Sequence, residues 1–437
     1  MTSLPGSPWL QRQGAQLVLD GCSLDELATR FGTPLFVYSQ RAMEDAAQRY
    51  LGALKGHPHL LCYAMKANST LAVLQTFARL GLGFDIVSGG ELLRALAAGA
   101  SPDQIVFSGV GKTAPEISLA LEHGVRCFNV ESTPELERLA ALARAAGRTA
   151  RISLRVNPDV DAGTHPYIST GLKNNKFGIA HREAVAAYRR AAELEGLQVD
   201  GIDCHIGSQI TQIEPYLDAL DRLLDLVESV ERAGITLHHV DIGGGLGITY
   251  DDETPPDASE LIGRVLDRLR ARGHGHRTLL MEPGRSLVGN AGVLLTEVQY
   301  LKHGEAKNFC IVDAAMNDLL RPAMYQAWMR VEACTESPGA EALTWDVVGP
   351  VCESGDWLAR DRQLALQPGA RLAILSAGAY GMSMASNYNS RGRAAEVMVR
   401  DGHSWLVRER ENPAHLFAGE RLLDTATLAD SRGPAGY

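Results

Sequence analysis

LLCYAMKA, residues 60–67, is the first of eight short apolar runs that recur along the chain, and it carries a lysine, Lys66, near its end. Most of the runs are rich in β-forming residues and end in Gly, Ser, Asn or Pro, which is typical of buried parallel strands. The other seven are GFDIVS (83–88), IVFSG (105–109), RCFNV (126–130), RISLRVNP (151–158), GIDCHIG (201–207), HHVDIGGG (238–245) and TLLMEPGR (278–285).

Segments with helical periodicity separate these runs. One is ESTPELERLAALARAAG (131–147), in which Pro134, after Ser132 and Thr133, marks a helix start. Eight βα units in about 240 residues match the size of a (β/α)8 barrel. A doubly wound open sheet is the alternative. Because an open sheet rarely needs eight successive units, the sequence favours an α/β fold of the TIM-barrel type.

Beyond Arg285 the pattern changes to alternating apolar and polar residues separated by turn signals, which predicts a C-terminal antiparallel β domain. Two strand-like pieces near the N-terminus, AQLVLD (15–20) and TPLFVYS (33–39), are expected to complete this domain. The predicted division is therefore a barrel over residues 40–285 and a β domain over residues 286–437, completed by residues 1–39.

The composition excludes several classes of protein. The chain has 437 residues, with 42 Lys and Arg against 52 Asp and Glu, a formal net charge of −10. Nucleic acids and anionic membranes both attract excess positive charge, so neither is expected as a partner. The hydrophobic fraction of 45% is that of a globular protein. Since the length exceeds what one core usually spans, two domains are expected.

The seven cysteines form no recognisable framework. Their count is odd and no CxxC pair occurs, so neither disulfides nor a metal site are expected. Reduced thiols point to the cytoplasm. The N-terminus lacks the basic start and apolar run of a signal peptide, and no stretch reaches the length of a transmembrane helix. The sequence therefore predicts a cytoplasmic protein.

In a barrel, catalytic groups lie at the C-terminal ends of the strands. Reading the runs in this way places a set of polar residues on one rim. They are Lys66 after the first run, Asp85 in the second, His205 and Ser208 at the sixth, Gly243, Gly244 and Gly245 at the seventh, and Glu282 and Arg285 at the eighth.

Lys66 is the candidate nucleophile. At the end of a buried run, desolvation is expected to lower the pKa of its amine and make it reactive toward a carbonyl group. A snorkelling lysine or a surface ion pair is the alternative for an isolated lysine. The other residues on the same rim favour the reactive amine.

GGGLG, residues 243–247, suggests backbone N–H groups that approach a phosphate, although a tight turn is the alternative. It matches neither nucleotide-binding motif. Arg285 adds a cation where barrels often bind phosphate. Glu282 offers a carboxylate to a pyridinium nitrogen, and His205 is either a ring-stacking residue or a core histidine. An amine, a phosphate cradle and a carboxylate together meet the requirements of pyridoxal 5'-phosphate.

The chain resembles the fold-type III, alanine-racemase-like pyridoxal phosphate decarboxylases, and within them the diaminopimelate decarboxylases. The resemblance covers nearly the whole chain and rests on many motifs in order. They are GTPLFVYS (32–39), YAMKANS (63–69), FDIVSGGEL (84–92), HPYISTGLKNNKFGI (165–179), HIGSQ (205–209), GGGLGITY (243–250), EPGRSLVGNAG (282–292), DAAMNDLLRPAMY (313–325), VVGPVCESGDWLARDR (347–362) and GAYGMSMASNYNSR (378–391).

The resemblance implies a role for each matching residue. Lys66 would attach the cofactor, and Cys352 would return a proton after carbon dioxide leaves. The cofactor site would consist of Lys66, Asp85, His205, Ser208, Gly243, Gly244, Gly245, Glu282, Gly284, Arg285 and Tyr380. The substrate would be held by Arg285, Arg321, Tyr325, Glu353 and Tyr380, with the first three on its distal carboxylate and Glu353 on its distal ammonium. In this family Cys352 and Glu353 come from a second subunit, so a homodimer with shared sites is expected.

The segment CESGD, residues 352–356, places a cysteine near two acidic residues. A free cysteine is commonly a small buried apolar residue. Here the acidic neighbours Glu353 and Asp356 are expected to raise the thiol pKa, which suits a proton donor, and to attract a cationic substrate. Related ornithine and arginine decarboxylases carry aspartate in place of the glutamate. Glu353 therefore favours, with Arg321 and Tyr325, a substrate with an amino-acid group at both ends.

The implied reaction converts meso-2,6-diaminopimelate to L-lysine and carbon dioxide, the last step of lysine biosynthesis. Three alternatives stay open: a decarboxylase of the same fold acting on ornithine, arginine, D-lysine or a carrier-bound amino acid; a racemase; and a cofactor-binding protein without turnover. His274 and His276 are expected to be solvated rather than metal ligands. Lys173 and Lys176 belong either to a mobile active-site loop or to a solvated one.

Overall fold

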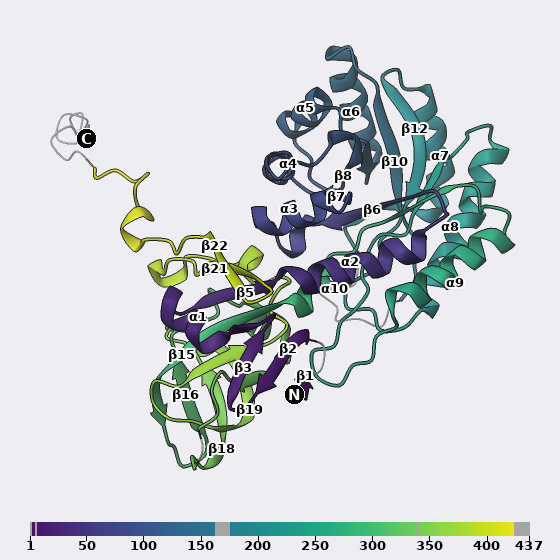
Figure 1. The fold of residues 1–437 in the computed structure, drawn as a ribbon. Coiled ribbons are helices and arrows are strands. Elements are labelled where there is room, and N and C mark those ends of the chain that lie inside the picture. The colour runs from purple at the N-terminus through teal and green to yellow at the C-terminus, as the bar shows by residue number, and fades with distance from the viewer. Residues whose placement is uncertain (1, 5–6, 162–174, 338, 424–437) are drawn as a thin grey trace, which may run out of the picture.

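The computed structural model describes residues 2–4, 7–161, 175–337 and 339–423 (Figure 1). Its largest part is a barrel of parallel strands, each within one of the eight predicted apolar runs or overlapping it. The sheet closes because β10 pairs with both β12 and β9, which excludes the doubly wound alternative. The barrel strands are β6 (His59–Ala64), β7 (Gly83–Ile86), β8 (Ile105–Phe107), β9 (Cys127–Val130), β10 (Ala150–Asn157), β12 (Leu197–Asp203), β13 (His239–Asp241) and β14 (Thr278–Met281).

Amphipathic helices surround the barrel (Figure 1). The start predicted at Pro134 is confirmed, because α6 begins at Thr133 and the Ser132 side chain accepts a hydrogen bond from the backbone N–H of Glu135. The helices of the barrel are α2 (Gln40–Leu54), α3 (Leu71–Arg79), α4 (Gly89–Ala97), α5 (Ala114–His123), α6 (Thr133–Ala145), α7 (His181–Glu193), α8 (Glu214–Arg232), α9 (Ala258–Ala271) and the short α10 (Arg285–Val288). A two-residue strand, β11 (Ile179–Ala180), pairs with the end of β10.

The second sheet is built from both ends of the chain. The predicted contribution of TPLFVYS is confirmed, because β5 (Leu35–Ser39) pairs antiparallel with β15 and parallel with β21. Most pairings are antiparallel, but β16 and β18 also run parallel. The remaining strands are β15 (Gly292–Lys302), β16 (Asn308–Val312), β17 (Val331–Ala333), β18 (Ala342–Val348), β19 (Trp357–Ala365), β20 (Arg371–Ile374), β21 (Ala395–Arg400) and β22 (His403–Arg408); the helix α11 (Arg321–Tyr325) lies between β16 and β17.

A small sheet and one helix complete the N-terminal region. AQLVLD contains β3, which lies in a separate antiparallel sheet with its neighbours and reaches the rest of the domain through a bridge from Gln16 to Thr335. This sheet comprises β1 (Thr2–Leu4), β2 (Ser7–Gln13), β3 (Gln16–Leu19) and β4 (Cys22–Ser23), followed by α1 (Leu24–Phe31).

The helix α2 joins the two parts. It begins directly after β5, where the Ser39 side chain accepts from the backbone N–H of Ala42. Figure 1 shows it running from the β domain across the barrel. The buried core continues from Phe36 and Tyr38 in β5 through Tyr50 in α2 to Tyr63 in β6. The two parts therefore share one continuous apolar core. Burying each of these aromatic rings stabilises the fold by about 2 kcal/mol.

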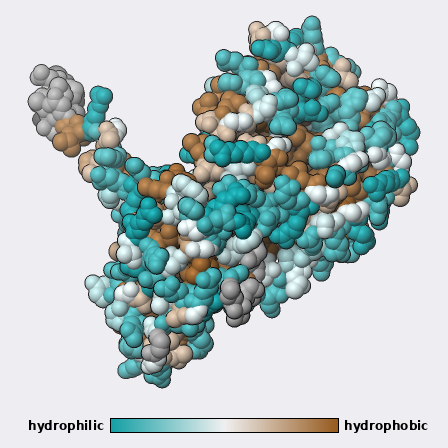
Figure 2. Space-filling view, viewed as in Figure 1, coloured by the Kyte–Doolittle hydropathy of each residue, from teal (hydrophilic) through white to brown (hydrophobic). Residues whose placement is uncertain are grey.

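The surface is mainly hydrophilic on the face in Figure 2, with scattered apolar patches. Four exposed apolar side chains, Leu71, Val87, Leu93 and Val110, belong to segments at one end of the barrel. No helix in the described part of the chain is both long and apolar enough to cross a lipid bilayer.

Candidate active site

A cavity of about 230 Å³ opens at the C-terminal ends of the barrel strands. It brings together predicted residues from six separate segments of the sequence, one of which is α11. Of the predicted residues it is lined by Lys66, His205, Ser208, Gly245, Glu282, Gly284, Arg285, Arg321, Tyr325 and Tyr380. Asp85 lies against Lys66, and Gly243 and Gly244 precede the lining loop. Cys352 and Glu353 do not line the cavity.

Lys66 follows β6 in a single 3₁₀ turn, and its Nζ lies 2.6 Å from Oδ2 of Asp85 on the neighbouring strand β7. Burial lowers the pKa of this amine, as predicted, but the carboxylates of Asp85 and Glu282 outweigh burial and raise the pKa above its ordinary value. The prediction of a lowered pKa is therefore wrong for the chain by itself. The amine has to leave Asp85 and lose its charge before it can attack a carbonyl group.

Glu282 belongs to a buried group of carboxylates below the cavity. Oxygens of Asp203, Asp241 and Glu282 lie within 4.8 Å of one another, and Asn129 donates to Oε1 of Glu282 at 3.2 Å. Burial, with Asp241 and then Asp85 as neighbours, raises the pKa of Glu282 well above its usual range. A cationic group beside Glu282 would relieve the repulsion among these carboxylates. A protonated ring nitrogen is such a group.

His205 also lines the cavity. Burial, with the charges of Arg155 and Lys66, lowers the pKa of its imidazole well below the ordinary value. The ring is therefore neutral over the physiological range. A Cβ on Gly243 would come within 3.1 Å of the His205 ring, so glycine is needed for the loop to pass this close.

The glycine loop has two different kinds of N–H group. Gly243 and Gly245 adopt positive φ angles of 68° and 100°, which glycine accommodates without strain. Contrary to the prediction, the N–H of Gly243 is committed to Oδ1 of Asp241 at 2.8 Å. The N–H groups of Gly244 and Gly245 have no acceptor within the described residues. Two backbone donors thus remain for an anion.

Arg285 and Arg321 are both buried, with 5% and 6% of their surface exposed, yet neither forms an ion pair with any carboxylate in the described part of the chain. Arg285 instead donates from Nη2 to the Ser208 hydroxyl at 3.0 Å. Buried charges are normally paired, because removing them from water is costly. Two buried cations that face one cavity without a counter-ion therefore indicate a site for an anion.

Sequence reasoning missed several residues of the cavity. Val87, Ser108, Gly109, Arg155 and Phe177 also line it. Arg155 pairs with Glu131 at 2.9 Å, and its guanidinium lies 4.8 Å from the centre of the Phe177 ring. The signal for Arg155 was an arginine inside the apolar run RISLRVNP, where only a specific partner makes a charge tolerable.

Cys352 and Glu353 are exposed on a loop of the β domain. The Tyr388 hydroxyl donates to Oε1 of Glu353 at 3.1 Å. Asp356 is buried, and its carboxylate accepts from the backbone N–H groups of Met316 and Val351. Its predicted role in attracting a cation is therefore wrong, because this carboxylate shapes the loop that presents Cys352 and Glu353.

The structure also bears on the weaker candidates, which are two histidines and two lysines. His274 is buried and hydrogen-bonded to Nε of Arg277 at 3.1 Å, so it is a core histidine rather than the solvated residue that was predicted. His276 is exposed, as predicted. Lys173 lies outside the described residues, and Lys176 Nζ lies 5.4 Å from the Phe177 ring.

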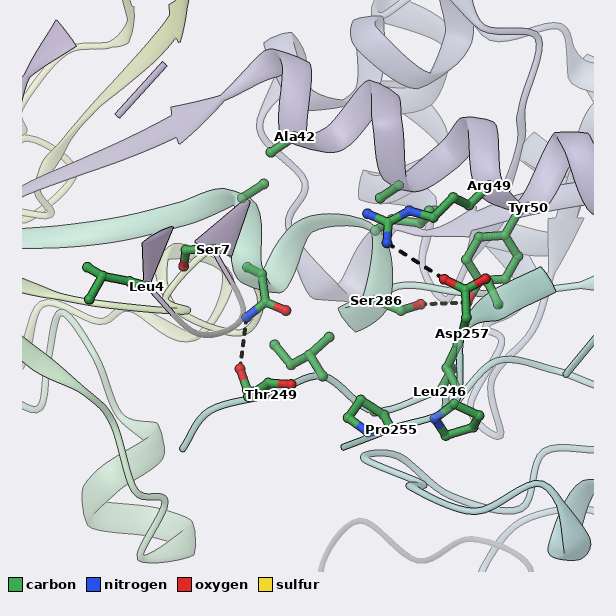
Figure 3. Close-up of a pocket in the computed structure, with 18 residues that line it drawn as sticks. Leu4, Ser7, Ala42, Arg49, Tyr50, Leu246, Thr249, Pro255, Asp257 and Ser286 are labelled. Carbon is green, nitrogen blue, oxygen red and sulfur yellow. Dashed lines mark hydrogen bonds and ion pairs between the residues drawn. The ribbon is translucent and has the colours of Figure 1, made fainter. Parts of the chain in front are cut away.

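A second cavity of about 380 Å³ lies behind the glycine loop, between α2 and α10, and contains none of the predicted site residues (Figure 3). Hydrogen bonds brace its walls: Tyr50 with Ser286 at 2.7 Å and Asn290 with the carbonyl of Thr249 at 2.9 Å. These hydrogen bonds hold the side of the glycine loop that faces away from the first cavity.

Comparison with known proteins agrees with this geometry. Residues 40–289 match the family model "Pyridoxal-dependent decarboxylase, pyridoxal binding domain". The diaminopimelate decarboxylase of Pseudomonas aeruginosa is 59% identical over 409 residues, covering 94% of this chain and 98% of that protein. The chain belongs to the diaminopimelate decarboxylase family.

Solved structures extend the likeness. Diaminopimelate decarboxylase from M. jannaschii in complex with L-lysine has a TM-score of 0.92 and 38% identity, covering 97% of this chain and all of that one. The enzyme from Helicobacter pylori, also complexed with L-lysine, has a TM-score of 0.87 and 42% identity, covering 91% and 98%.

The residues of the cavity fit the pyridoxal phosphate of a diaminopimelate decarboxylase. Lys66 could supply the amine, and Glu282 offers a buried carboxylate that forms no ion pair with the residues the structure describes. The N–H groups of Gly244 and Gly245 are free for a phosphate, and Oδ1 of Asp85 is buried without a hydrogen-bond partner among the described residues. The chain thus leaves donors and acceptors unsatisfied where this cofactor has complementary groups.

Proposed function

We propose that this chain decarboxylates meso-2,6-diaminopimelate to L-lysine and carbon dioxide with pyridoxal phosphate as its cofactor. The observation that carries the substrate is the pair of buried arginines, Arg285 and Arg321, that face the cavity of Lys66 without a carboxylate partner. A substrate with a second, non-reacting carboxylate supplies the missing charge, whereas ornithine or arginine does not. The relatives named as diaminopimelate decarboxylases support the same choice.

Each residue of the cavity has its own role in the proposed reaction. Lys66 attaches the cofactor and afterwards releases the product, while Glu282 keeps a proton on the ring nitrogen. His205, being neutral, packs on the ring without adding charge. Gly244, Gly245 and Ser208 hold the phosphate. When bound, pyridoxal phosphate supplies an electron-accepting ring that takes up the electron pair left by the departing carboxylate.

The distal end of the substrate is held by its own set of residues. Arg285, Arg321 and Tyr325 bind the non-reacting carboxylate, and Tyr380 contacts both substrate and phosphate. With this end fixed, these residues would hold the scissile carboxylate in one orientation beside the bound cofactor, which lowers the entropic cost of cleavage.

We further propose that the active unit is a homodimer. Cys352 and Glu353 are exposed and do not line the cavity of their own chain. A second copy would insert them into this cavity, where Cys352 returns the proton and Glu353 binds the distal ammonium. The exposed apolar residues Leu71, Val87 and Leu93 suit a covered surface near its mouth.

We propose that the chain has two domains. One is a cofactor-binding barrel over residues 40–285, and the other is a β domain over residues 286–437 that is completed by residues 1–39. The match of the cofactor-binding family model to residues 40–289 supports the first part. The buried free thiols, six of the seven, support a reducing compartment, the cytoplasm.

The test is carbon dioxide release by the holoenzyme. The panel holds meso-diaminopimelate, its LL isomer, both enantiomers of lysine and ornithine, and L-arginine, with products identified by mass spectrometry. Release from the meso isomer with L-lysine as product is expected. Faster release from ornithine or arginine would move the proposal to another substrate, and racemisation without carbon dioxide would replace it.

A further inference from the structure

Tyr250 closes the glycine segment GGGLGITY and is buried, with 6% of its surface exposed. It does not line the cavity but lies behind two residues that do. Nη1 of Arg285 donates to the Tyr250 hydroxyl at 2.5 Å, and the guanidinium carbon of Arg321 lies 4.4 Å from the centre of the Tyr250 ring. One phenol therefore touches both cations that are proposed to bind the distal carboxylate.

Arg285 and Arg321 need a neighbouring group that stabilises their charges. They carry like charges in a buried site, and burial, with the charge of Arg285, lowers the pKa of Arg321 from its ordinary value. Nη1 of Arg321 donates to Sδ of Met329 at 3.4 Å, which is a weak acceptor. An aromatic face attracts a cation through its quadrupole, most strongly where water is absent. Among the described residues, the Tyr250 ring is thus an aromatic face in direct contact with the Arg321 guanidinium.

Tyr250 is itself fixed from behind. Its backbone N–H donates to Oε2 of Glu253 at 2.8 Å, and the Thr249 hydroxyl donates to the carbonyl of Glu253 at 2.8 Å. Asn290 holds the carbonyl of Thr249, the bond drawn in Figure 3. The loop that presents N–H groups to the phosphate thus ends in a side chain that holds the two arginines.

We propose that Tyr250 is a positioning residue for substrate specificity: its hydroxyl and its ring hold Arg285 and Arg321 at the spacing that grips the distal carboxylate. This inference rests on the proposed function. The two contacts differ in chemistry. Arg285 donates to the Tyr250 hydroxyl and lies 5.8 Å from the ring centre, whereas Arg321 contacts the ring face at 4.4 Å. Phenylalanine at this position keeps the second contact and loses the first, whereas leucine loses both.

The test compares two ligands of the holoenzyme that differ by one carboxylate, L-lysine and cadaverine. Binding is followed by the change in cofactor absorbance in wild type, Tyr250→Phe and Tyr250→Leu. A charge-assisted hydrogen bond contributes enough that Tyr250→Phe should weaken L-lysine roughly tenfold. Tyr250→Leu should weaken it several-fold more, and both should leave cadaverine within about twofold of wild type. The KM for meso-diaminopimelate should rise in the same order.

Tyr188→Phe is the matched control, because it removes another buried tyrosine hydroxyl, which donates to the carbonyl of Gly201 at 2.8 Å far from the arginines. It should change neither ligand. Equal weakening of L-lysine and cadaverine by the Tyr250 variants would show a merely structural role and overturn the inference, as would unchanged L-lysine binding in Tyr250→Leu. A wild-type enzyme that binds cadaverine as tightly as L-lysine would instead overturn the proposed distal carboxylate site.

Discussion

At the scale of single residues, the chemistry of the cavity depends on where charge is buried. The chain buries acidic groups at Asp85, Asp241 and Glu282, and it buries cations at Arg285 and Arg321. Each set is incomplete by itself: the carboxylates repel one another and the arginines lack an anion. Ligands that carry a cation at one end and carboxylate at the other therefore complete both sets.

Lys66→Ala should abolish covalent attachment of pyridoxal phosphate and lower turnover of meso-diaminopimelate by at least about a thousandfold, because among the described residues that line the cavity Lys66 is the only lysine. Mass spectrometry after borohydride treatment measures attachment. Lys307→Ala, at an exposed lysine paired with Asp346, is the control and should behave as wild type. A cofactor adduct in Lys66→Ala at wild-type yield would remove the assignment.

Asp241→Asn tests the buried carboxylates through pH. Burial raises the pKa of Asp241 to about 6, and the pKa of Glu282 is raised as well. An acid with a raised pKa in the folded state stabilises the fold below its unfolded pKa, about 4, and loses this contribution as the pH rises through the folded value. The cofactor-free protein should therefore unfold at a lower temperature at pH 8 than at pH 5.

In Asp241→Asn this difference in melting temperature should shrink, because one carboxylate is gone while an amide oxygen can still accept the N–H of Gly243. Differential scanning calorimetry of both proteins at the two pH values measures it. Asp267→Asn, at a side chain that is 75% exposed, should keep the wild-type difference. A variant at position 241 that also kept the wild-type difference would contradict the raised pKa of the Asp241 carboxyl group.

At the scale of elements, the loop after β13 connects most parts of the site. It packs its backbone against the segment after β14, offers two N–H groups to the cavity and ends in Tyr250. The eight apolar runs and the amphipathic segments between them were sufficient to predict the strands and helices, because burial on both faces of a barrel strand leaves a continuous apolar signature. The contacts of the loop were not predictable, since they join residues far apart in sequence.

Gly244→Ala should disrupt this loop. A Cβ at this position would lie 2.1 Å from the carbonyl oxygen of Glu282, so the loop or the residue after β14 has to shift. We expect pyridoxal phosphate to bind at least about tenfold more weakly, measured by fluorescence titration, because the N–H donors move with the loop. Gly263→Ala is the matched control: it lies in α9 with open space around it and should bind cofactor normally.

At the scale of the whole molecule, the barrel and the β domain are interleaved rather than joined end to end. The strand β5 precedes the barrel in sequence but pairs with β15 and β21, which follow it. The β domain also carries α11, whose Arg321 and Tyr325 line the cavity at the ends of the barrel strands. The same domain carries Cys352 and Glu353 on its exposed surface, away from the cavity of the same chain.

Mixing two inactive variants tests the shared site. Lys66→Ala and Cys352→Ala damage different halves of one composite site, so a mixed dimer keeps one intact site. Random exchange of subunits should restore about a quarter of wild-type activity, since half of the dimers are mixed and each has one working site of two. Each variant mixed with itself is the control. No recovery after verified exchange would show that each chain completes its own site.

The sequence by itself determined the barrel, the β domain and most residues of the cavity, because hydrophobic periodicity and motif order are local properties of the chain. Lys66, His205, Glu282 and Arg285 could be placed on one rim from strand ends alone. Only the tertiary structure decided how these groups affect one another. The pairing of Lys66 with Asp85 raises rather than lowers the pKa of the amine, and the burial of Asp356 and His274 turns two apparent surface residues into structural ones. These outcomes depend on distances between residues that are remote in sequence, and electrostatic energy is set by those distances and by the exclusion of water.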